Sequence, residues 1–583
     1  MRSKVSVVFL ILSAMPTAQA LAQEGGRRFS KGQEVGYLGE TSRSAMARNV
    51  LNRLKNRTDA RAVASQADRV LLWHEIALDA VAIDHTPDPD TGAVDLSNGG
   101  PTRTSRALAM TQIAVFDAVN AILDQYTPYN ELGPTPQNAS IDAAIAYAAY
   151  TALTTLYPGQ VDRLTALLDS DVAKINDNPA RISAGQMIGV QAAQAMLNRH
   201  LNDHADDPEP DFGEGGRVAD GATTVNGTPV NGGTTLPFEW ESDPLTPLAP
   251  GETGLALGAY WGGVTPFSLE RGDQYRSAPP PEPGSAQYLA GYQEVQTIGA
   301  STDTEGSLST PYTRFIGNFW GYDGAPLLGT PPRSYNQIAV QVARDEGIDN
   351  PLDMARYLAM INTALADAGI AAWDSKFYYN YWRPVTAIPQ SDGVPETIEN
   401  SLWKPVGISV INTETAITPT PPFPAYPSGH STFGAAVFEI MREFFGNETR
   451  FTFISDEYNG EGVDPLGVPR PLVPVRFQSF DEAQHSNGIS RIYNGVHWQW
   501  DNVAGQELGE TIGAHVLFHE EAFQPATNSC PADLNGNGAV DANDLAELIS
   551  VWGSCDECDA DLNADGVING HDMAIMLSAW GPC

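Results

Sequence analysis

Apolar residues recur at helical spacing along most of the chain between residues 70 and 518. Ile113, Phe116, Val119 and Ile122 follow an i, i+3/i+4 pattern, which places them on one face of a helix. Few segments alternate apolar and polar residues as a half-buried strand would. The pattern predicts an all-α body of two packed helical bundles. Its helices are expected to include residues 142–157, 160–175, 182–201, 353–373, 431–445 and 489–518.

Other segments divide the chain further. Residues 1–22 combine an early positive charge, a short apolar run and a small-x-small cleavage site, which predicts a signal peptide and a secreted, extracellular or periplasmic protein. Residues 23–68 are polar and predict an N-terminal arm, followed by a catalytic domain at 69–523. Long stretches rich in Gly and Pro, such as 203–285, predict irregular loops. No other segment is expected to span a membrane.

The chain is strongly acidic, with a formal net charge of −38. Such a surface repels nucleic acid and anionic membranes, which excludes both as partners. An acidic protein that binds an anion must concentrate its cations at one place. Three motifs do so within residues 315–520, namely Lys376-x6-Arg383-Pro384, Pro427-Ser428-Gly429-His430 and Ser490-Arg491-x3-Gly495-x-His497.

The first two motifs supply cations, a hydroxyl and a helix N-terminus. Lys376 and Arg383 are seven residues apart and are expected on one helix face, with Pro384 ending that helix. Ser428 adds a hydroxyl donor, and Gly429 lets the backbone approach an anion at the start of the 431–445 helix.

The two imidazoles and the third cation complete the predicted anion cage. His430 is the expected acid/base beside the anion. Arg491 and His497 are expected on the same helix, where His497 would bond the anion's central atom and Gly495 would clear space for it. Each motif alone also fits a solvated helix, a plain turn or a packed core histidine. Their combination favours a site for a tetrahedral oxyanion.

The triple motif resembles the superfamily of vanadium-dependent haloperoxidases and type 2 phosphatidic acid phosphatases. The likeness is greater to the fungal chloroperoxidase branch and runs from Phe319 to Asp501. It is carried by Phe319-Trp-Gly-Tyr-Asp323-Gly, Gly329-Thr-Pro-Pro-Arg-Ser-Tyr-Asn-Gln-Ile338, Trp373-Asp-Ser-Lys376, Pro421-Pro-Phe423-Pro-Ala-Tyr-Pro-Ser-Gly-His430 and Gly495-Val-His-Trp498.

This resemblance implies a role for each matched residue. The vanadate oxygens would be bound by Lys376, Arg383, Ser428, Gly429 and Arg491. His497 would be the axial vanadium ligand and His430 the acid/base, while Asp323 would hold the fork of Arg491. Trp373 and Phe423 match positions that line the halide side of the pocket, although they also fit an ordinary aromatic core.

Two activities follow from the resemblance. As a haloperoxidase, the protein would oxidise halide with hydrogen peroxide to hypohalous acid through peroxovanadate, with an organic acceptor that the sequence leaves open. With phosphate at the same site, it would be an exported acid phosphatase in which His497 forms a phosphohistidine. Trp373, Phe423 and the match around Asp323 favour the haloperoxidase.

The C-terminal residues 530–583 contain an internal duplication. Both copies place oxygen ligands and a central glycine at the spacing of an EF-hand calcium loop, with Asp at the last position. The predicted calcium ligands are Asp533, Asn535, Asn537, Ala539, Asp541 and Asp544 in one copy, and Asp561, Asn563, Asp565, Val567, Asn569 and Asp572 in the other.

The duplication resembles a dockerin-like module, which implies a cohesin-like or surface-scaffold protein as its partner. The chain's four cysteines also lie here, and each copy begins and ends with one. Of the three pairings, Cys530–Cys555 with Cys558–Cys583 is preferred. A different function class, a tethered surface component with a degenerate body, is disfavoured because no motif residue is missing.

Overall fold

The computed structural model describes residues 40–526, apart from 137, 415–417 and most of 210–253, and residues 532–582, apart from 536–538, 555–557 and 564–565. The predicted signal peptide at 1–22 lies outside these residues. The chain divides into two compact units. One comprises Met1–Leu123 with Pro128–Glu521, and the other Asp124–Thr127 with Ala522–Cys583.

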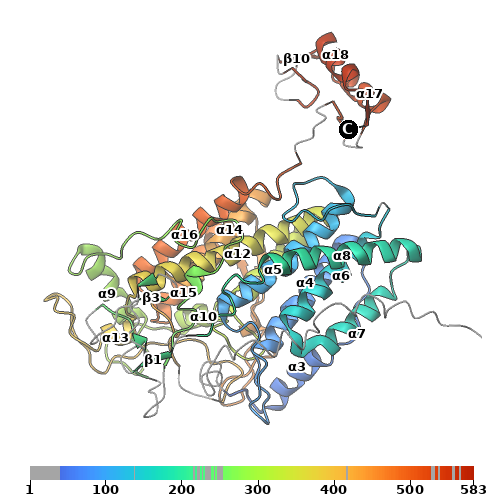
Figure 1. The fold of residues 1–583 in the computed structure, drawn as a ribbon. Coiled ribbons are helices and arrows are strands. Elements are labelled where there is room, and N and C mark those ends of the chain that lie inside the picture. The colour runs from blue at the N-terminus through green and yellow to red at the C-terminus, as the bar shows by residue number, and fades with distance from the viewer. Residues whose placement is uncertain are drawn as a thin grey trace, which may run out of the picture. The chain divides into compact units, whose positions relative to one another are not determined.

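The first half of the large unit is a helical bundle (Figure 1). Its long central helix α5 packs against α6 and α8, which also pack against each other. Helix boundaries follow capping residues, as at Ser140, whose hydroxyl accepts from the N–H of Ala143. The bundle contains α3 (Ala45–Lys55), α4 (Gln66–Asp84), α5 (Gly100–Leu123), α6 (Ile141–Leu156), η2 (Pro158–Gln160), α7 (Val161–Val172) and α8 (Pro179–Arg199).

By length and composition, α5 is apolar enough to cross a membrane. However, 83% of its 18-residue window is buried inside the protein. The sequence predicted that no segment beyond the signal peptide is long and apolar enough to span a membrane. The helix α5 corrects that prediction. The neighbouring helices cover the apolar side chains of α5, so the helix is packed as a core element.

The segment predicted as an arm contains the helix α3. Ser44 caps it by accepting from the N–H of Ala47. Ala47 and Leu51 are buried together with Tyr322 and other residues of the following bundle. The partly buried Met46, Val50 and Leu54 pack against the same cluster. The helical pattern is therefore present in the sequence, but it covers only the 11 residues of α3 within a polar segment and was not recognised.

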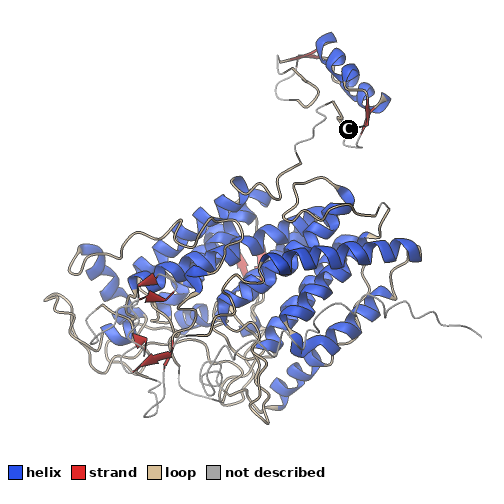
Figure 2. Ribbon diagram, viewed as in Figure 1, coloured by secondary structure: helices blue, strands red, loops and turns tan. Residues whose placement is uncertain are grey.

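The second half of the large unit is a larger bundle arranged around α12, which packs against α5, α14 and α16. Asn350 caps α12 by accepting from the N–H groups of Leu352 and Asp353. Helices dominate this half as well (Figure 2). Its helices are η3 (Trp261–Gly263), α9 (Ala286–Ile298), α10 (Pro311–Phe319), α11 (Pro331–Asp345), α12 (Pro351–Tyr379), α13 (Pro384–Ala387), α14 (Gly429–Phe445), η4 (Asp456–Tyr458), α15 (Phe480–Tyr493) and α16 (Gln499–Phe518).

Glycines on α16 bring it unusually close to α14. A Cβ atom at Gly505 would lie 2.6 Å from the carbonyl oxygen of Ser428, and one at Gly509 would lie 2.2 Å from that of Thr432. Backbone contact at this distance requires glycine. The contact sets the beginning of α14, which carries the second motif, beside the first turns of α16, which follow the third motif.

The described strands are short. In the large unit, β6 (Phe451–Phe453) pairs antiparallel with β7 (Val475–Phe477). The small elements within the predicted irregular stretch are β1 (Asp211–Gly213), β2 (Arg217–Val218), β3 (Thr224–Val225), β4 (Thr228–Pro229) and β5 (Gly254–Leu255).

The small unit shows the duplication seen in the sequence. Each copy has a short strand followed by a helix, β8 (Ala539–Val540) with α17 (Ala542–Ser550) and β10 (Val567–Ile568) with α18 (Gly570–Ser578). Strand β9 (Gly553–Ser554) pairs with β10, and β11 (Gly581–Pro582) pairs with β8. Leu548 and Met576 occupy equivalent places in a separate core.

Candidate active site

Lys376 and Arg383 converge from different elements, which corrects the prediction of one helix face. Lys376 lies in the last turn of α12. That helix ends at Asn380, whose φ of 48° is left-handed. Arg383 follows in extended conformation as the residue before α13. The early break in α12 lets the Arg383 side chain reach the site without spanning two helical turns.

The ammonium group of Lys376 is fully buried and surrounded by carbonyl groups. Its Nζ donates to the carbonyl oxygens of Pro424 at 2.8 Å, Ala425 at 3.1 Å and Pro427 at 2.5 Å. Burial, followed by the charge of Arg383, holds the pKa of Lys376 well below its usual value. All three donors have acceptors, so Lys376 serves the site chiefly through its charge.

The guanidinium of Arg383 has one donor group left over. Its Nε donates to the carbonyl of Phe423 at 2.9 Å and its Nη1 to that of Val496 at 2.7 Å. Among the described residues, its buried Nη2 has no hydrogen-bond partner. Burial is the main cause that lowers the pKa of Arg383 to about 9.

Arg491 shows the same incomplete pairing. It binds Asp323 with both terminal nitrogens, at 2.6 Å from Nη2 and 3.3 Å from Nη1, as the sequence predicted. Its buried Nε has no partner within the described chain. A buried donor without an acceptor is costly, and an anion would supply the acceptors that Arg383 and Arg491 lack.

The second motif forms the beginning of α14. Ser428 is the capping residue, and its side chain accepts from the N–H of Ser431. Gly429 is the first helical residue, and a Cβ atom there would lie 3.3 Å from the ring of Trp373. The free amides and positive dipole end of this 17-residue helix are favourable for an anion.

His430 is held by backbone carbonyl groups. Its Nε2 lies 2.9 Å from the carbonyl oxygen of Gly321 and 3.1 Å from that of Trp320. Both are acceptors, so Nε2 carries the proton and Nδ1 keeps a lone pair. Burial, followed by the charge of Arg491, holds the pKa of His430 well below 6.5. His430 is therefore a neutral base at neutral pH.

His497 lies between two helices rather than within one. The predicted helix 489–518 breaks into α15, which ends at Tyr493, and α16, which begins at Gln499. Arg491 is in the last turn of α15, and His497 is in the linker. Gly495 permits this break with a φ of 68°. A Cβ atom at Gly495 would lie 2.3 Å from the carbonyl oxygen of Gly299, so this glycine provides close backbone contact rather than space for His497.

Asp501 is a functional residue that the motif analysis did not assign. Its Oδ2 lies 2.9 Å from Nδ1 of His497 and also accepts from the N–H of Trp498. This bond fixes the proton on Nδ1 and leaves the Nε2 lone pair for a ligand, 3.4 Å from Nη1 of Arg383. Burial raises the pKa of Asp501 to about 7. Its i, i+4 spacing from His497 was the signal that could have found it.

The two predicted pocket aromatics pack on each other beside the cage. The ring centres of Trp373 and Phe423 are 4.8 Å apart. Nζ of Lys376 lies 5.6 Å from the first ring centre and 5.1 Å from the second. The indole N–H of Trp373 donates to the carbonyl of Leu257 at 2.8 Å. A halide beside these rings would be close to the buried cation.

The donor set fits a tetrahedral oxyanion such as vanadate. The site contains three cations and two carboxylates, so its net charge is positive when all five groups are ionised. They are Lys376, Arg383 and Arg491 with Asp323 and Asp501. The imidazole nitrogen of His497 provides a ligand atom, and that of His430 a base. The structure thus brings together the residues of all three motifs with Asp323 and Asp501.

The two predicted calcium loops of the tail share one repeated hydrogen bond. Asp544 is buried, and its Oδ1 accepts from the backbone N–H of Asn535 at 3.0 Å. In the other copy Asp572 accepts from the N–H of Asn563 at 3.3 Å. The predicted ligands Asn537 and Asp565 lie outside the described residues.

One cysteine of the tail is described. Cys558 is disulfide-bonded. The other three cysteines, Cys530, Cys555 and Cys583, lie outside the described residues, so the preferred pairing stays a prediction.

The helical fold and the cage agree with what comparisons with known proteins show. Residues 356–524 match the family model of the VCPO second helical-bundle domain, and residues 531–578 match that of the dockerin type I domain. Over these residues the chain is thus similar to the vanadium chloroperoxidases and to dockerin domains. It is similar to the vanadium chloroperoxidase of Curvularia inaequalis, with 29% identity over 507 residues that cover 75% of this chain and 80% of that protein.

Solved structures share the fold. The first bacterial vanadium-dependent iodoperoxidase is 24% identical with a TM-score of 0.59, over 80% of this chain and 100% of that one. A holo-type bacterial vanadium-dependent chloroperoxidase is 17% identical with a TM-score of 0.52, over 73% of this chain and 93% of that one. These likenesses confirm the predicted all-α fold.

Proposed function

We propose that this protein is a vanadium-dependent haloperoxidase that oxidises halide with hydrogen peroxide to hypohalous acid. One observation carries the proposal. Among the described residues, Arg383 Nη2 and Arg491 Nε are buried without partners, and Nε2 of His497 offers a lone pair that meets Arg383 Nη1 at a long distance of 3.4 Å. Together these groups would bind the oxygens of an oxyanion and offer it a nitrogen ligand. The similarity to chloroperoxidases favours vanadate as that anion.

When bound, vanadate supplies a Lewis-acid centre at which peroxide is activated toward halide. Arg383, Arg491, Ser428 and the amide of Gly429 would hold its oxygens. His430 would take a proton from peroxide at Nδ1, because its Nε2 already donates to backbone carbonyls. The buried charge of Lys376 would stabilise the negative charge that develops during the reaction.

Export and calcium binding complete the proposal. Residues 1–22 would direct secretion, and the dockerin domain would bind calcium and a cohesin-like partner. The repeated bonds made by Asp544 and Asp572 support two equivalent loops. The two loops would together form one domain whose folding depends on calcium.

The test compares bromination of a phenolic dye with phosphate-ester hydrolysis by the metal-stripped protein, with and without orthovanadate. We expect peroxide-dependent bromination that requires vanadate and is lost in His497→Ala. Repeating the assay with chloride and iodide would define the halide preference. Strong ester hydrolysis that vanadate inhibits, without bromination, would overturn the proposal and show a phosphatase at the same site.

A further inference from the structure

His430 donates its Nε2–H to backbone carbonyl groups of a short turn that links α10 to the following loop. Gly321 supplies the closer carbonyl, and Asp323, two residues later, binds Arg491. The turn therefore orients both the base and one anion-binding cation. Its conformation is uncommon, because Tyr322 has a φ of 48° in the left-handed region.

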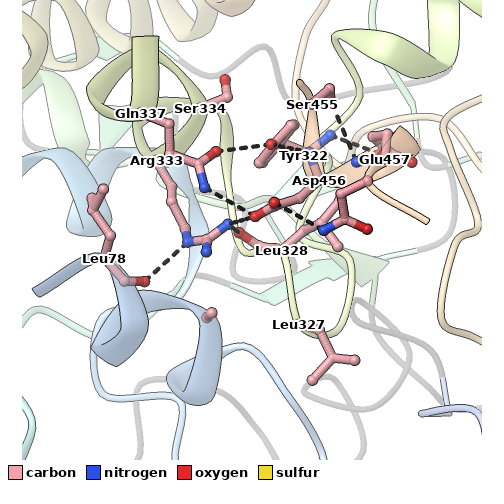
Figure 3. A network of polar contacts seen from close by, with 12 residues as sticks. Leu78, Tyr322, Leu327, Leu328, Arg333, Ser334, Gln337, Ser455, Asp456 and Glu457 are labelled. Atoms are coloured by element: carbon pink, nitrogen blue, oxygen red, sulfur yellow. Dashed lines mark hydrogen bonds and ion pairs between the residues drawn. The ribbon is translucent and has the colours of Figure 1, made fainter. Parts of the chain in front are cut away.

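The side chain of Tyr322 is held at its far end. Its hydroxyl donates to Oε1 of Gln337 at 2.9 Å and accepts from the N–H of Asp456 at 2.7 Å (Figure 3). Tyr322 is fully buried. These contacts hold the tyrosine against η4 and leave its backbone amide facing Glu457.

Glu457 is a fully buried carboxylate behind this turn. Its Oε1 accepts from the N–H of Tyr322 at 3.1 Å, and its Oε2 accepts from the hydroxyl of Ser409 at 2.7 Å and from Arg470 at 2.5 Å. The N–H of Tyr322 and the guanidinium of Arg470 can only donate, so each oxygen of Glu457 acts as an acceptor. Burial raises the pKa of Glu457, and the adjacent charge of Arg470 opposes this and favours the ionised carboxylate. A Cβ atom at Gly321 would lie 2.4 Å from Oε1, so glycine is required for this contact.

The amide of Tyr322 and the carbonyl of Gly321 belong to the same peptide group. The chain of contacts thus runs from Glu457 to the N–H of Tyr322, and from the carbonyl of Gly321 to Nε2–H of His430. An anion at the N–H end polarises the peptide and makes its carbonyl a stronger acceptor. That carbonyl then favours the proton on Nε2 of His430.

We propose that Glu457 is a positioning residue that holds His430 in its Nε2–H tautomer through the Gly321–Tyr322 peptide group. This keeps the Nδ1 lone pair toward the cage. The inference rests on the proposed function only for the chemical role of His430. The other charged groups near this ring are Asp323, at 3.9 Å, with Arg491, Lys376 and His497.

The substitution Glu457→Gln tests this inference. Glutamine has nearly the same shape, but its NH₂ group would face a donor, either Tyr322 N–H or Arg470 with Ser409. We expect His430 to change from one tautomer to a mixture, seen as a shift of its ring ¹⁵N signals at neutral pH. Bromination should lose about tenfold in kcat, the size typical of lost ligand-orienting contacts.

Asp456→Asn is the matched control. Asp456 lies in the same turn of η4 and binds Arg333, Gln337 and Asn459, but its side chain does not contact the Gly321–Tyr322 peptide. The ¹⁵N signals of His430, identified by their loss in His430→Ala, should be unchanged in this control. Glu457→Asp keeps the charge and shortens the reach, and serves if the glutamine variant does not fold.

The tautomer measurement needs no enzyme activity, so it separates this inference from the proposed function. Absent bromination by the wild type would overturn the function and leave the tautomer result valid. Unchanged His430 signals in folded Glu457→Gln or Glu457→Asp would overturn the role of Glu457. Equal changes in Asp456→Asn would also overturn it, because they would show a general disturbance of the turn.

Discussion

At the scale of single residues, Asp501 determines which nitrogen of His497 can bind the anion. Asp501→Asn would keep the size of the side chain and remove the carboxylate that accepts from Nδ1. We expect orthovanadate affinity to fall about 10- to 100-fold, as is typical when a ligand histidine loses its orienting partner. Equilibrium binding measured by calorimetry would test this prediction.

Asp117→Asn is the matched control for that measurement. Asp117 is another buried aspartate whose pKa burial raises to about 7, but it lies on α5 and accepts from the N–H groups of Tyr129 and Asn130. Vanadate affinity should be unchanged in this variant. Equal losses of affinity in both variants would contradict a specific role for Asp501.

Residue identities in the cage could be predicted because the three motifs are local. The partners Asp323 and Trp373 followed from the resemblance. Glu457 could not be predicted, because it acts through a backbone amide more than 130 residues earlier in the chain. A contact of this kind leaves no spacing pattern in the sequence.

At the scale of elements, His85 links the end of α4 to the beginning of α5. Its Nδ1 donates to the carbonyl of Val81, and its Nε2 accepts from the N–H of Gly100 at 3.1 Å. Burial lowers the pKa of His85 to about 4, below its ordinary 6.5. The folded state therefore binds fewer protons than the unfolded state between these values, and stability falls as pH drops through this window.

The variant His85→Gln tests this pH dependence of stability, because glutamine does not bind a proton in this range. The variant should be less stable than the wild type at pH 7, but the gap should narrow by up to about 3 kcal/mol as pH falls to 4. Urea unfolding at several pH values would measure the gap. A gap of constant size would show that His85 does not titrate in this window.

Gly495 sets the angle between α15 and α16. Gly495→Ala would place a Cβ atom 2.3 Å from the carbonyl oxygen of Gly299, in addition to straining a φ of 68°. We expect a loss of about 2 kcal/mol or more in unfolding free energy, together with weaker vanadate binding because His497 follows in the linker. Thermal unfolding and vanadate titration would measure both.

Gly393→Ala is the control that separates the effect of backbone strain from the effect of the steric contact at Gly495. Gly393 has a similar φ of 76°, but a Cβ atom there would meet nothing within 4 Å. It should lose only about 1 kcal/mol and keep its vanadate affinity. A similar loss in both variants would mean that strain alone explains Gly495→Ala.

Helices could be predicted where a long apolar face is buried, as in α6, α8 and α12. The break between α15 and α16 could not, because Ile489 to Phe518 keeps a helical pattern on both sides of it. Tertiary contact with Gly299 imposes the break, and propensity alone gives no sign of it. The short helix α3 was missed although its apolar residues follow a helical spacing, because this pattern is brief and lies within a polar segment.

At the scale of the whole molecule, the two compact units have separate cores. Calcium removal by EDTA should therefore unfold the tail and leave the body folded, because the tail carries the predicted calcium loops. Calorimetry should show one transition that moves to lower temperature with EDTA and a second that does not. Movement of both transitions would contradict independent units.

The cage is assembled from segments as distant in sequence as Asp323 and His497. The three motifs and Asp323 are far from one another in the unfolded chain, so the site forms only when the second bundle is nearly complete. This late step of folding brings the positive charges of Lys376, Arg383 and Arg491 together before an anion has bound. An anion present during folding would relieve this repulsion and draw the equilibrium toward the native state. The oxyanion would thus act as a folding ligand before it took part in chemistry.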